Sequence, residues 1–172
     1  MFQKSTKSGA RALVSAAFAA ALLFAGPHNL ARSAVPAGGP FADLTGTWSG
    51  EGTVTTSNGT SERIRCKAKY SVSPSGADLH QTLRCASDSY RFDVSADVVY
   101  EDGAVSGTWT EATRQASGHL TGRLNGSAVE ATIAGTGFTA RLALTTRGGQ
   151  QAVSIRPTDV DVTAITISLR RG

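Results

Sequence analysis

The stretch that decides the fold runs from residue 63 to residue 85 and reads RIRCKAKYSVSPSGADLHQTLRC. Its first eight residues alternate between basic and uncharged side chains, which is the pattern of a strand with one solvent-facing side. Ser75-Gly76 then provides a turn signal. If the chain reverses there, Cys66 falls directly opposite Cys85 on the uncharged face. The sequence therefore predicts a β-hairpin that is closed by a Cys66–Cys85 disulfide.

The chain from Leu44 onward continues in the same way. Short alternating segments are separated by further turn signals, namely Asn58-Gly59, Asp102-Gly103, Asn125-Gly126 and Gly148-Gly149. Reversal at these turns opposes Tyr100 to Val105 and Leu144 to Val153, so apolar residues share a face. We predict an all-β fold of about ten antiparallel strands, each paired with its neighbours in the sequence.

The remaining hairpins give further register predictions. They oppose Leu83 to Phe92, Trp109 to Leu120, Leu120 to Ala131, Ile133 to Phe138 and Ile155 to Val160. At Asn58-Gly59 a three-residue loop is needed to keep Val54 on the face of Ile64. Near Ala164 the apolar alternation changes phase, which predicts a bulge or a bend.

A single open sheet of this size would leave an apolar face and two edges exposed. Closure into an up-and-down barrel removes both problems, and a meander favours it over a Greek-key sandwich. An outer-membrane barrel would show a similar alternation, but it should carry aromatic girdles. Only 6% of the residues are aromatic, and the chain ends in SLRRG. We therefore expect a small closed barrel over residues 43–172.

The N-terminal region has the order of a secretory signal. Lys4, Lys7 and Arg11 precede the apolar run ALVSAAFAAALLFAG. This run is short for a membrane span, so a retained anchor is the less favoured alternative. We predict a signal peptide over residues 1–33, a linker over 34–42 and a periplasmic or secreted protein. A pair of cysteines fits an oxidising compartment.

Removal of this signal changes the charge of the protein. The chain has 17 basic and 13 acidic residues, and four of the basic ones lie in the first 34 positions, which leaves 13 of each. A neutral chain argues against nucleic acid as a partner. The predicted register places Lys67 opposite Arg84 and Arg84 opposite Arg91. We call the resulting set the basic stripe: Arg63, Arg65, Lys67, Lys69, Arg84 and Arg91. It is either a site for an anionic glycan, an anionic lipid or an acidic partner protein, or a solvated surface.

Gly46-Thr47-Trp48 begins the first strand, and DGAVSGTW (102–109) repeats its centre. These residues resemble the Gly-x-Trp start of calycin barrels, the group of lipocalins, fatty-acid-binding proteins and avidins. The resemblance implies that Trp48 packs across one barrel end. Gly50 and Val54 occupy positions where avidins carry polar side chains, so biotin binding is not expected. The chain after the signal also resembles small exported proteins of alphaproteobacteria.

The inward face predicts what the barrel could hold. Trp48, Tyr70, Gln81 and Trp109 are the candidate residues for a ligand cavity. Glycines share this face, with Gly107 expected opposite Gly122. Such glycines either leave a cavity or permit strand coiling beneath an aromatic ring.

Nothing in the sequence favours catalysis. It contains no nucleophile elbow, paired carboxylates or metal cluster, and alternation places His80 and His119 outside. We expect no cofactor, and the oligomeric state stays open. The sequence predicts a non-catalytic exported binding protein for a small apolar ligand or an anionic envelope component. The alternative is a loop-mediated inhibitor or interaction module with a filled barrel.

Overall fold

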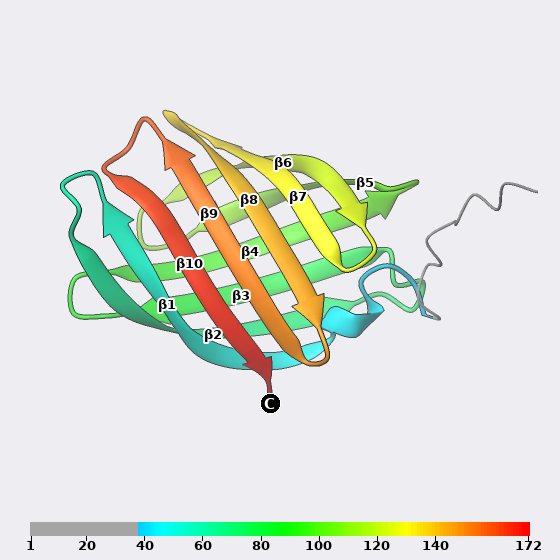
Figure 1. Ribbon diagram of the computed structural model, residues 1–172. Helices are drawn as coiled ribbons and strands as arrows, with labels where there is room; N and C mark the ends of the chain where they lie inside the picture. Colours follow the sequence, from blue (N-terminus) through cyan, green and yellow to red (C-terminus); the bar gives the residue numbers. More distant parts are fainter. Residues whose placement is uncertain (1–37) are drawn as a thin grey trace, which may run out of the picture. The chain divides into compact units, whose positions relative to one another are not determined.

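The computed structural model describes residues 38–172, and they form an all-β barrel (Figure 1). The predicted signal peptide over 1–33 and the first residues of the linker lie outside the described residues. Among the described residues, no helix has the length and apolar character needed to cross a membrane.

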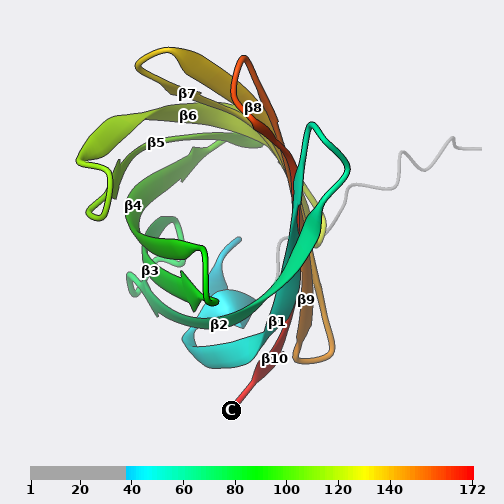
Figure 2. The same cartoon turned by 90° about the vertical axis from the view of Figure 1, so that its left-hand side faces the viewer.

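A 3-10 helix, η1 (Ala42–Leu44), precedes ten strands. The strands are β1 (Gly46–Thr56), β2 (Ser61–Val72), β3 (Asp78–Ala86), β4 (Arg91–Glu101), β5 (Ala104–Glu111), β6 (Ala116–Asn125), β7 (Ala128–Gly135), β8 (Phe138–Arg147), β9 (Gln150–Thr158) and β10 (Val162–Arg171). Each strand pairs antiparallel with its sequence neighbours, and β1 pairs with β10. The ring of strands is therefore continuous (Figure 2), and the predicted closed barrel is confirmed.

The hairpin that decides the fold has the predicted register. Cys66 lies opposite Cys85, with the two Cα atoms 4.1 Å apart, and the cysteines form a disulfide. The registers of Tyr100 with Val105 and of Leu144 with Val153 are also confirmed. The pairing of β1 with β10 shifts near Ala164, where the sequence predicts a bulge or bend.

Four other registers differ from the prediction by two residues. The β3–β4 turn places Leu83 opposite Val94 and Arg84 opposite Asp93, because the chain reverses one residue later than expected. The same kind of displacement affects the β5–β6, β6–β7 and β7–β8 hairpins: Trp109 lies opposite Gly118, Leu120 opposite Ile133, and Ile133 opposite Ala140. A shift of two residues keeps every side chain on its predicted face.

The predicted position of the turn between β9 and β10 is also wrong. Pro157 and Thr158 belong to β9, and Ile155 lies opposite Ile165 instead of Val160. The reversal takes place beyond Thr158, where Asp159 adopts a positive φ of 65°. Aspartate tolerates this left-handed conformation better than most residues, so it supplies the turn that we assigned to Pro157-Thr158.

Candidate functional site: the barrel interior and the outer basic face

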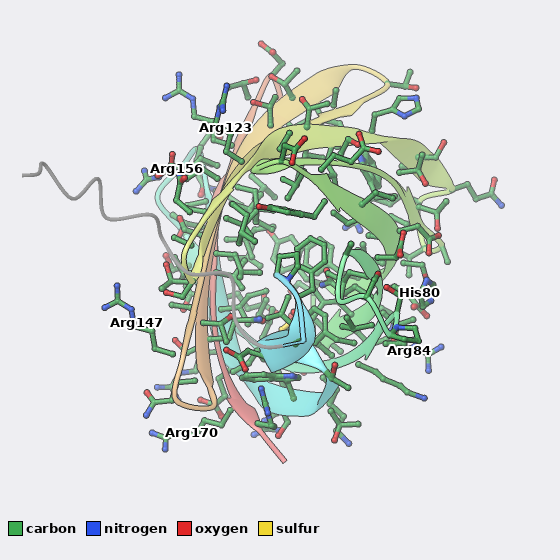
Figure 3. All side chains as sticks on the ribbon, turned by 90° about the vertical axis from the view of Figure 1, so that its right-hand side faces the viewer. His80, Arg84, Arg123, Arg147, Arg156 and Arg170 are labelled. Atoms are coloured by element: carbon green, nitrogen blue, oxygen red, sulfur yellow. A yellow bond between two sulfur atoms is a disulfide. The ribbon has the colours of Figure 1, made fainter. Side chains whose placement is uncertain are left out.

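Trp48 closes one end of the barrel, as the calycin resemblance implies. Its side chain is 1% exposed, and its indole N–H donates to the Leu44 carbonyl of η1 over 2.8 Å. The Tyr70 ring meets it edge-on at 6.3 Å, and the Arg171 guanidinium lies 4.8 Å from the ring centroid. Figure 3 views the barrel from this end, with η1 in front. Strand β1, strand β10 and η1 are thus joined through one side chain.

Phe41 adds to this closure, although it lies in the range that we assigned to the linker. Its side chain is buried and packs edge-on against Tyr100, with 6.4 Å between the ring centroids. Its backbone N–H donates to the Gly76 carbonyl in the β2–β3 turn. At least this residue before η1 is therefore part of the packed barrel.

A polar pair lies just inside the closed end. The Tyr70 hydroxyl donates to the Gln151 side-chain carbonyl over 2.7 Å, and the Gln151 amide donates to the Thr146 hydroxyl over 3.3 Å. Gln151 is 2% exposed. Our sequence analysis missed this glutamine, although alternation with Val153 and Ile155 places it inside. Burial raises the pKa of Tyr70 to about 12, against the opposing effect of the hydrogen bond to Gln151.

The raised pKa of Tyr70 predicts a loss of stability at alkaline pH. The folded protein favours the neutral phenol, so its stabilisation is fully present below pH 10, the ordinary pKa, and disappears as pH rises through about 12. We expect a loss of roughly 2–3 kcal/mol across this interval, from about 1.4 kcal/mol per pKa unit. Urea unfolding at several alkaline pH values should show this loss in the wild type and not in Tyr70→Phe. A Tyr90→Phe protein that also lacks it would contradict the assignment to Tyr70.

The middle of the barrel is lined by small residues. The glycines and alanines on the inward face are Gly50, Gly52, Ala68, Ala96, Gly107, Ala131 and Ala140. An eight-stranded barrel is about as wide as its inward side chains can fill, and this barrel has ten strands. Small residues in a wider barrel leave space along the axis.

Exposure of larger inward residues agrees with this space. Leu83, Leu142, Leu144 and Ile155 lie within strands and face inward, yet each stays partly exposed. Gln81, opposite the buried Tyr70, is also partly exposed, and among residues 38–172 its amide has no hydrogen-bond partner. These inward side chains are therefore not fully packed against their neighbours at mid-barrel.

The inward glycines serve the backbone more than they open a cavity. A Cβ on Gly50 would lie 1.9 Å from the Ser168 carbonyl oxygen, and one on Gly107 would lie 2.1 Å from that of Asp97. Glycine is needed here because neighbouring strands approach closely where they coil. The expected pairing of Gly107 with Gly122 is wrong, since Gly107 lies opposite Leu120.

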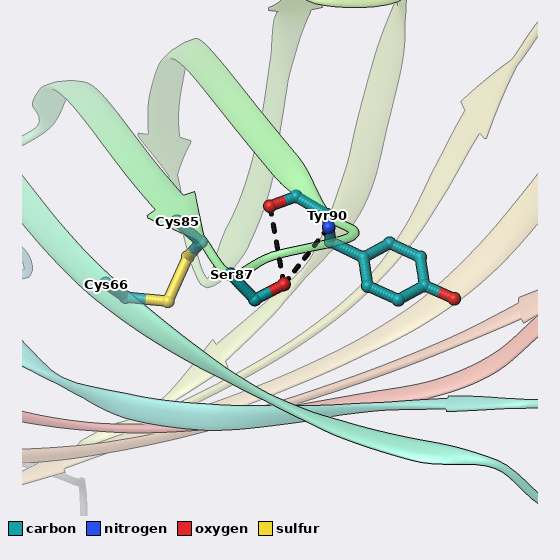
Figure 4. The surroundings of a disulfide bond; sticks show 4 residues. All are labelled: Cys66, Cys85, Ser87 and Tyr90. Carbon is teal, nitrogen blue, oxygen red and sulfur yellow. Dashed lines mark hydrogen bonds between the residues drawn. A yellow bond between two sulfur atoms is a disulfide. The ribbon is translucent and has the colours of Figure 1, made fainter.

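Aromatic side chains gather at the other end of the barrel. Trp109 contacts Phe138 with 5.8 Å between ring centroids, and its indole N–H donates to the Ala134 carbonyl. Tyr90 stacks on Phe92 with 6.1 Å between centroids. Figure 4 shows the Tyr90 backbone held by the Ser87 hydroxyl, with the ring directed away from the disulfide. These rings give this end an apolar rim.

Glu111 at this end is structural. It is 6% exposed, and its carboxylate accepts hydrogen bonds from the backbone N–H groups of Asp93 and Arg114 over 2.9 and 2.8 Å. Burial would raise the pKa of Glu111, but these bonds and those from Thr113 outweigh burial and hold the pKa below its usual value. The ionised carboxylate therefore fixes the β5–β6 loop.

The basic stripe faces outward, but its register needs a correction. Alternation on β2 is confirmed, since Arg65, Lys67 and Lys69 are exposed between buried neighbours and Arg63 is exposed next to the buried Ile64. Lys67 lies opposite Arg84 as expected. The row of cations does not extend from β3 to β4, because Arg84 lies opposite Asp93 and its Nε pairs with that carboxylate over 3.1 Å. Arg91 lies opposite Ala86 instead. The charge balance of this surface is therefore less one-sided than the sequence suggests.

The outer face of β1 to β4 also holds a depression of about 870 Å³. Its charged lining consists of Glu51, Arg65, Lys67, Arg84, Arg91 and Asp93. We call this depression the basic groove. It lies on the surface opposite to the barrel interior, so the structure holds two separate candidate sites.

The protein resembles solved structures in fold. No protein-family model matches the chain, and no curated protein matches it. The crystal structure of Rv2717c from M. tuberculosis aligns with a TM-score of 0.59 at 11% identity, covering 76% of this chain and 94% of that one. The S-type phycobiliprotein lyase CPES from Guillardia theta aligns with a TM-score of 0.57 at 9% identity, covering 77% and 90%. At such low identity these likenesses concern the fold alone.

The four candidate cavity residues differ in whether their polar atoms are free to bind a ligand. Trp48, Tyr70 and Trp109 already use their polar atoms in hydrogen bonds within the protein. Gln81 is the one of the four predicted residues whose polar atoms stay without a partner among the described residues. The assignment of all four to a ligand cavity stays a prediction.

The histidines lie outside, as their alternation predicts. His80 Nδ1 and Asp97 Oδ1 are 2.7 Å apart on the exposed surface, and His119 is exposed on β6. Within residues 38–172 no three metal-ligating side chains come together.

Proposed function

We propose that the barrel binds a small, largely apolar molecule in its interior, without catalysing a reaction. The observation that carries the proposal is the partial exposure of the inward residues Leu142, Leu144 and Ile155. Apolar side chains that face an enclosed space with access to solvent favour an apolar occupant, because its entry removes their surface from water.

The ligand enters from the end opposite Trp48. Trp48, Phe41 and η1 occupy the near end, whereas the far end carries the rings of Tyr90, Phe92, Trp109 and Phe138. Gln81 offers one amide inside the barrel, both a donor and an acceptor. The preferred ligand is therefore apolar over most of its surface and has a single polar group.

Other observations support parts of this proposal. The Cys66–Cys85 disulfide is compatible with an exported, periplasmic or secreted protein. One structural neighbour is a phycobiliprotein lyase, so a barrel of this fold acts on another molecule in that protein. Ser71, His80 and Asp97 lie side by side on the outer face, and His80 Nδ1 pairs with Asp97. Among the described residues Ser71 makes no hydrogen bond to His80, and none of the three faces the interior, which is why we propose binding without catalysis.

A neutral apolar dye tests the interior site. N-phenyl-1-naphthylamine should bind the wild type with enhanced fluorescence, and Leu142→Trp should weaken binding at least about tenfold, because the larger ring fills the space the dye needs. The neutral dye avoids attraction to the basic groove. Native mass spectrometry of the freshly purified protein should also show a bound small molecule.

The matched control is Ala143→Trp, which adds the same ring on the outward side of the same strand. It should leave dye binding unchanged. A filled barrel would give the opposite pattern, with no dye bound by the wild type and a Leu142→Trp protein destabilised by about 1–3 kcal/mol through overpacking. That result would favour the loop-mediated interaction module.

A further inference from the structure

The basic groove is organised around a small residue. Ala86 lies on the outer face of β3, with Arg65 of β2 opposite it on one side and Arg91 of β4 opposite it on the other. Arg84 precedes it by two residues on the same strand and so shares its face. Adjacent strands are about 4.8 Å apart, which puts the two flanking backbones roughly 10 Å from each other. The space above Ala86 is thus bordered by three arginines.

Most of these cations lack an acidic partner. Among residues 38–172, Arg84 pairs with Asp93, while Arg65, Lys67 and Arg91 form no ion pair. Glu51 lies opposite Arg65 on β1 without reaching ion-pair distance. The groove therefore holds four cations against two carboxylates, whereas residues 38–172 as a whole carry equal numbers of basic and acidic side chains. The groove is a local excess of positive charge.

The cations continue around the barrel beyond the groove. Arg170 of β10 lies opposite Ser49, Ser49 lies opposite Lys67, and Lys67 lies opposite Arg84. This row crosses three strand spacings, or about 14 Å. Figure 3 shows Arg84 and Arg170 projecting away from the barrel on different sides. The positive charge therefore follows a curved path perpendicular to the strands.

We infer that the basic groove binds an acidic glycan chain, independently of the interior ligand. A flexible chain can follow the curved row, and its carboxylate or sulfate groups suit the planar donors of arginine. A flat bilayer would meet a convex barrel along a line only. The exposed large apolar residues of the described chain are Val99 and Val160, and neither lines the groove to insert into lipid. The one aromatic residue of the groove lining is Phe92, which lies opposite Cys85 and shares its inward face, so the outer groove has no aromatic centre of the kind typical of protein interfaces.

Titration with size-defined acidic oligosaccharides tests this inference. Heparin and polygalacturonate oligosaccharides serve as sulfated and carboxylated probes, with neutral dextran as the negative probe, all at low salt. The triple variant Arg65→Gln, Lys67→Gln, Arg91→Gln should bind at least one acidic probe about tenfold or more weakly than the wild type. Binding should also weaken as salt rises.

The matched control removes the same charge elsewhere. Arg123, Arg141 and Arg156 lie outside on β6, β8 and β9, and the variant with all three replaced by glutamine should bind within about twofold of the wild type. Equal loss in both triple variants would show attraction to overall charge and overturn the site.

A second pair of variants tests the position of the anion. Ala86→Glu places a carboxylate at the centre of the groove and should abolish binding, whereas Ala86→Gln, of the same size, should retain it. Thermal unfolding checks that each variant is folded. Vesicles that contain phosphatidylglycerol serve as an additional probe. Binding to these vesicles without binding to either oligosaccharide would overturn the inference in favour of a membrane surface. No binding of any acidic probe by the wild type would also overturn it, while leaving the interior site untouched.

Discussion

Replacing Trp48 by alanine is expected to lower the free energy of unfolding by about 4 kcal/mol or more. Truncation of a buried large aromatic residue costs about 3–5 kcal/mol through lost burial and the cavity that remains. Here the change also removes the hydrogen bond to Leu44 and the ring beneath Arg171. Because Trp48 joins β1, β10 and η1, its loss opens the closed end of the barrel.

Urea unfolding followed by far-ultraviolet circular dichroism measures this effect without relying on tryptophan fluorescence. Trp48→Phe keeps most of the apolar contact and loses the hydrogen bond, so it should cost less than the alanine variant, by roughly 2 kcal/mol or more. The exposed neighbour Thr47→Ala should stay within about 0.5 kcal/mol of the wild type. An unfolding free energy of Trp48→Ala within about 1 kcal/mol of the wild type would be the effect of an average substitution. That result would contradict the role of Trp48 in closing the barrel end.

The second large effect concerns the disulfide. The double variant Cys66→Ala, Cys85→Ala should be less stable than the wild type by about 3 kcal/mol, since the bridge closes a loop with a sequence separation of 19. Both cysteines are buried on the inner face, between Gly50 and Phe92. Their removal therefore loosens the wall that the basic groove and the interior share.

Guanidinium unfolding with and without reductant separates the bridge from the substitution itself. Reductant should bring the wild type close to the double variant and leave the variant unchanged. The result would count against the prediction if the variant matched the oxidised wild type.

Alternation in the sequence predicted which face of each strand is buried, and it did so even where the residue register between two paired strands was wrong. The reason is geometric, since moving a turn by one residue moves the register by two and leaves the faces alone. The Cys66–Cys85 register came out right because turn and cysteines agreed independently. No such second signal existed for the turn that we assigned to Ser87-Asp88, so Arg84 was paired with Arg91 instead of Asp93.

Contacts between residues that are distant in sequence were therefore harder to predict than the side of a strand on which each residue lies. The inward position of Tyr70 follows from alternation, but its hydrogen bond to Gln151 joins strands that are 81 residues apart in sequence. Nothing local in the sequence indicates this bond. The packing of Phe41 against Tyr100 was missed for the same reason.

The pairing of β1 with β10 has a consequence for the order of folding. Nine hairpins join neighbouring strands and need only short loops to close, whereas Trp48 and Arg171 must meet across almost the whole barrel sequence. Closing so long a loop has a larger entropic cost, and contacts of this kind slow folding. We expect the hairpins to assemble first as a curved ribbon. The final contact between β1 and β10 then turns ten separately marginal pairings into one cooperative unit.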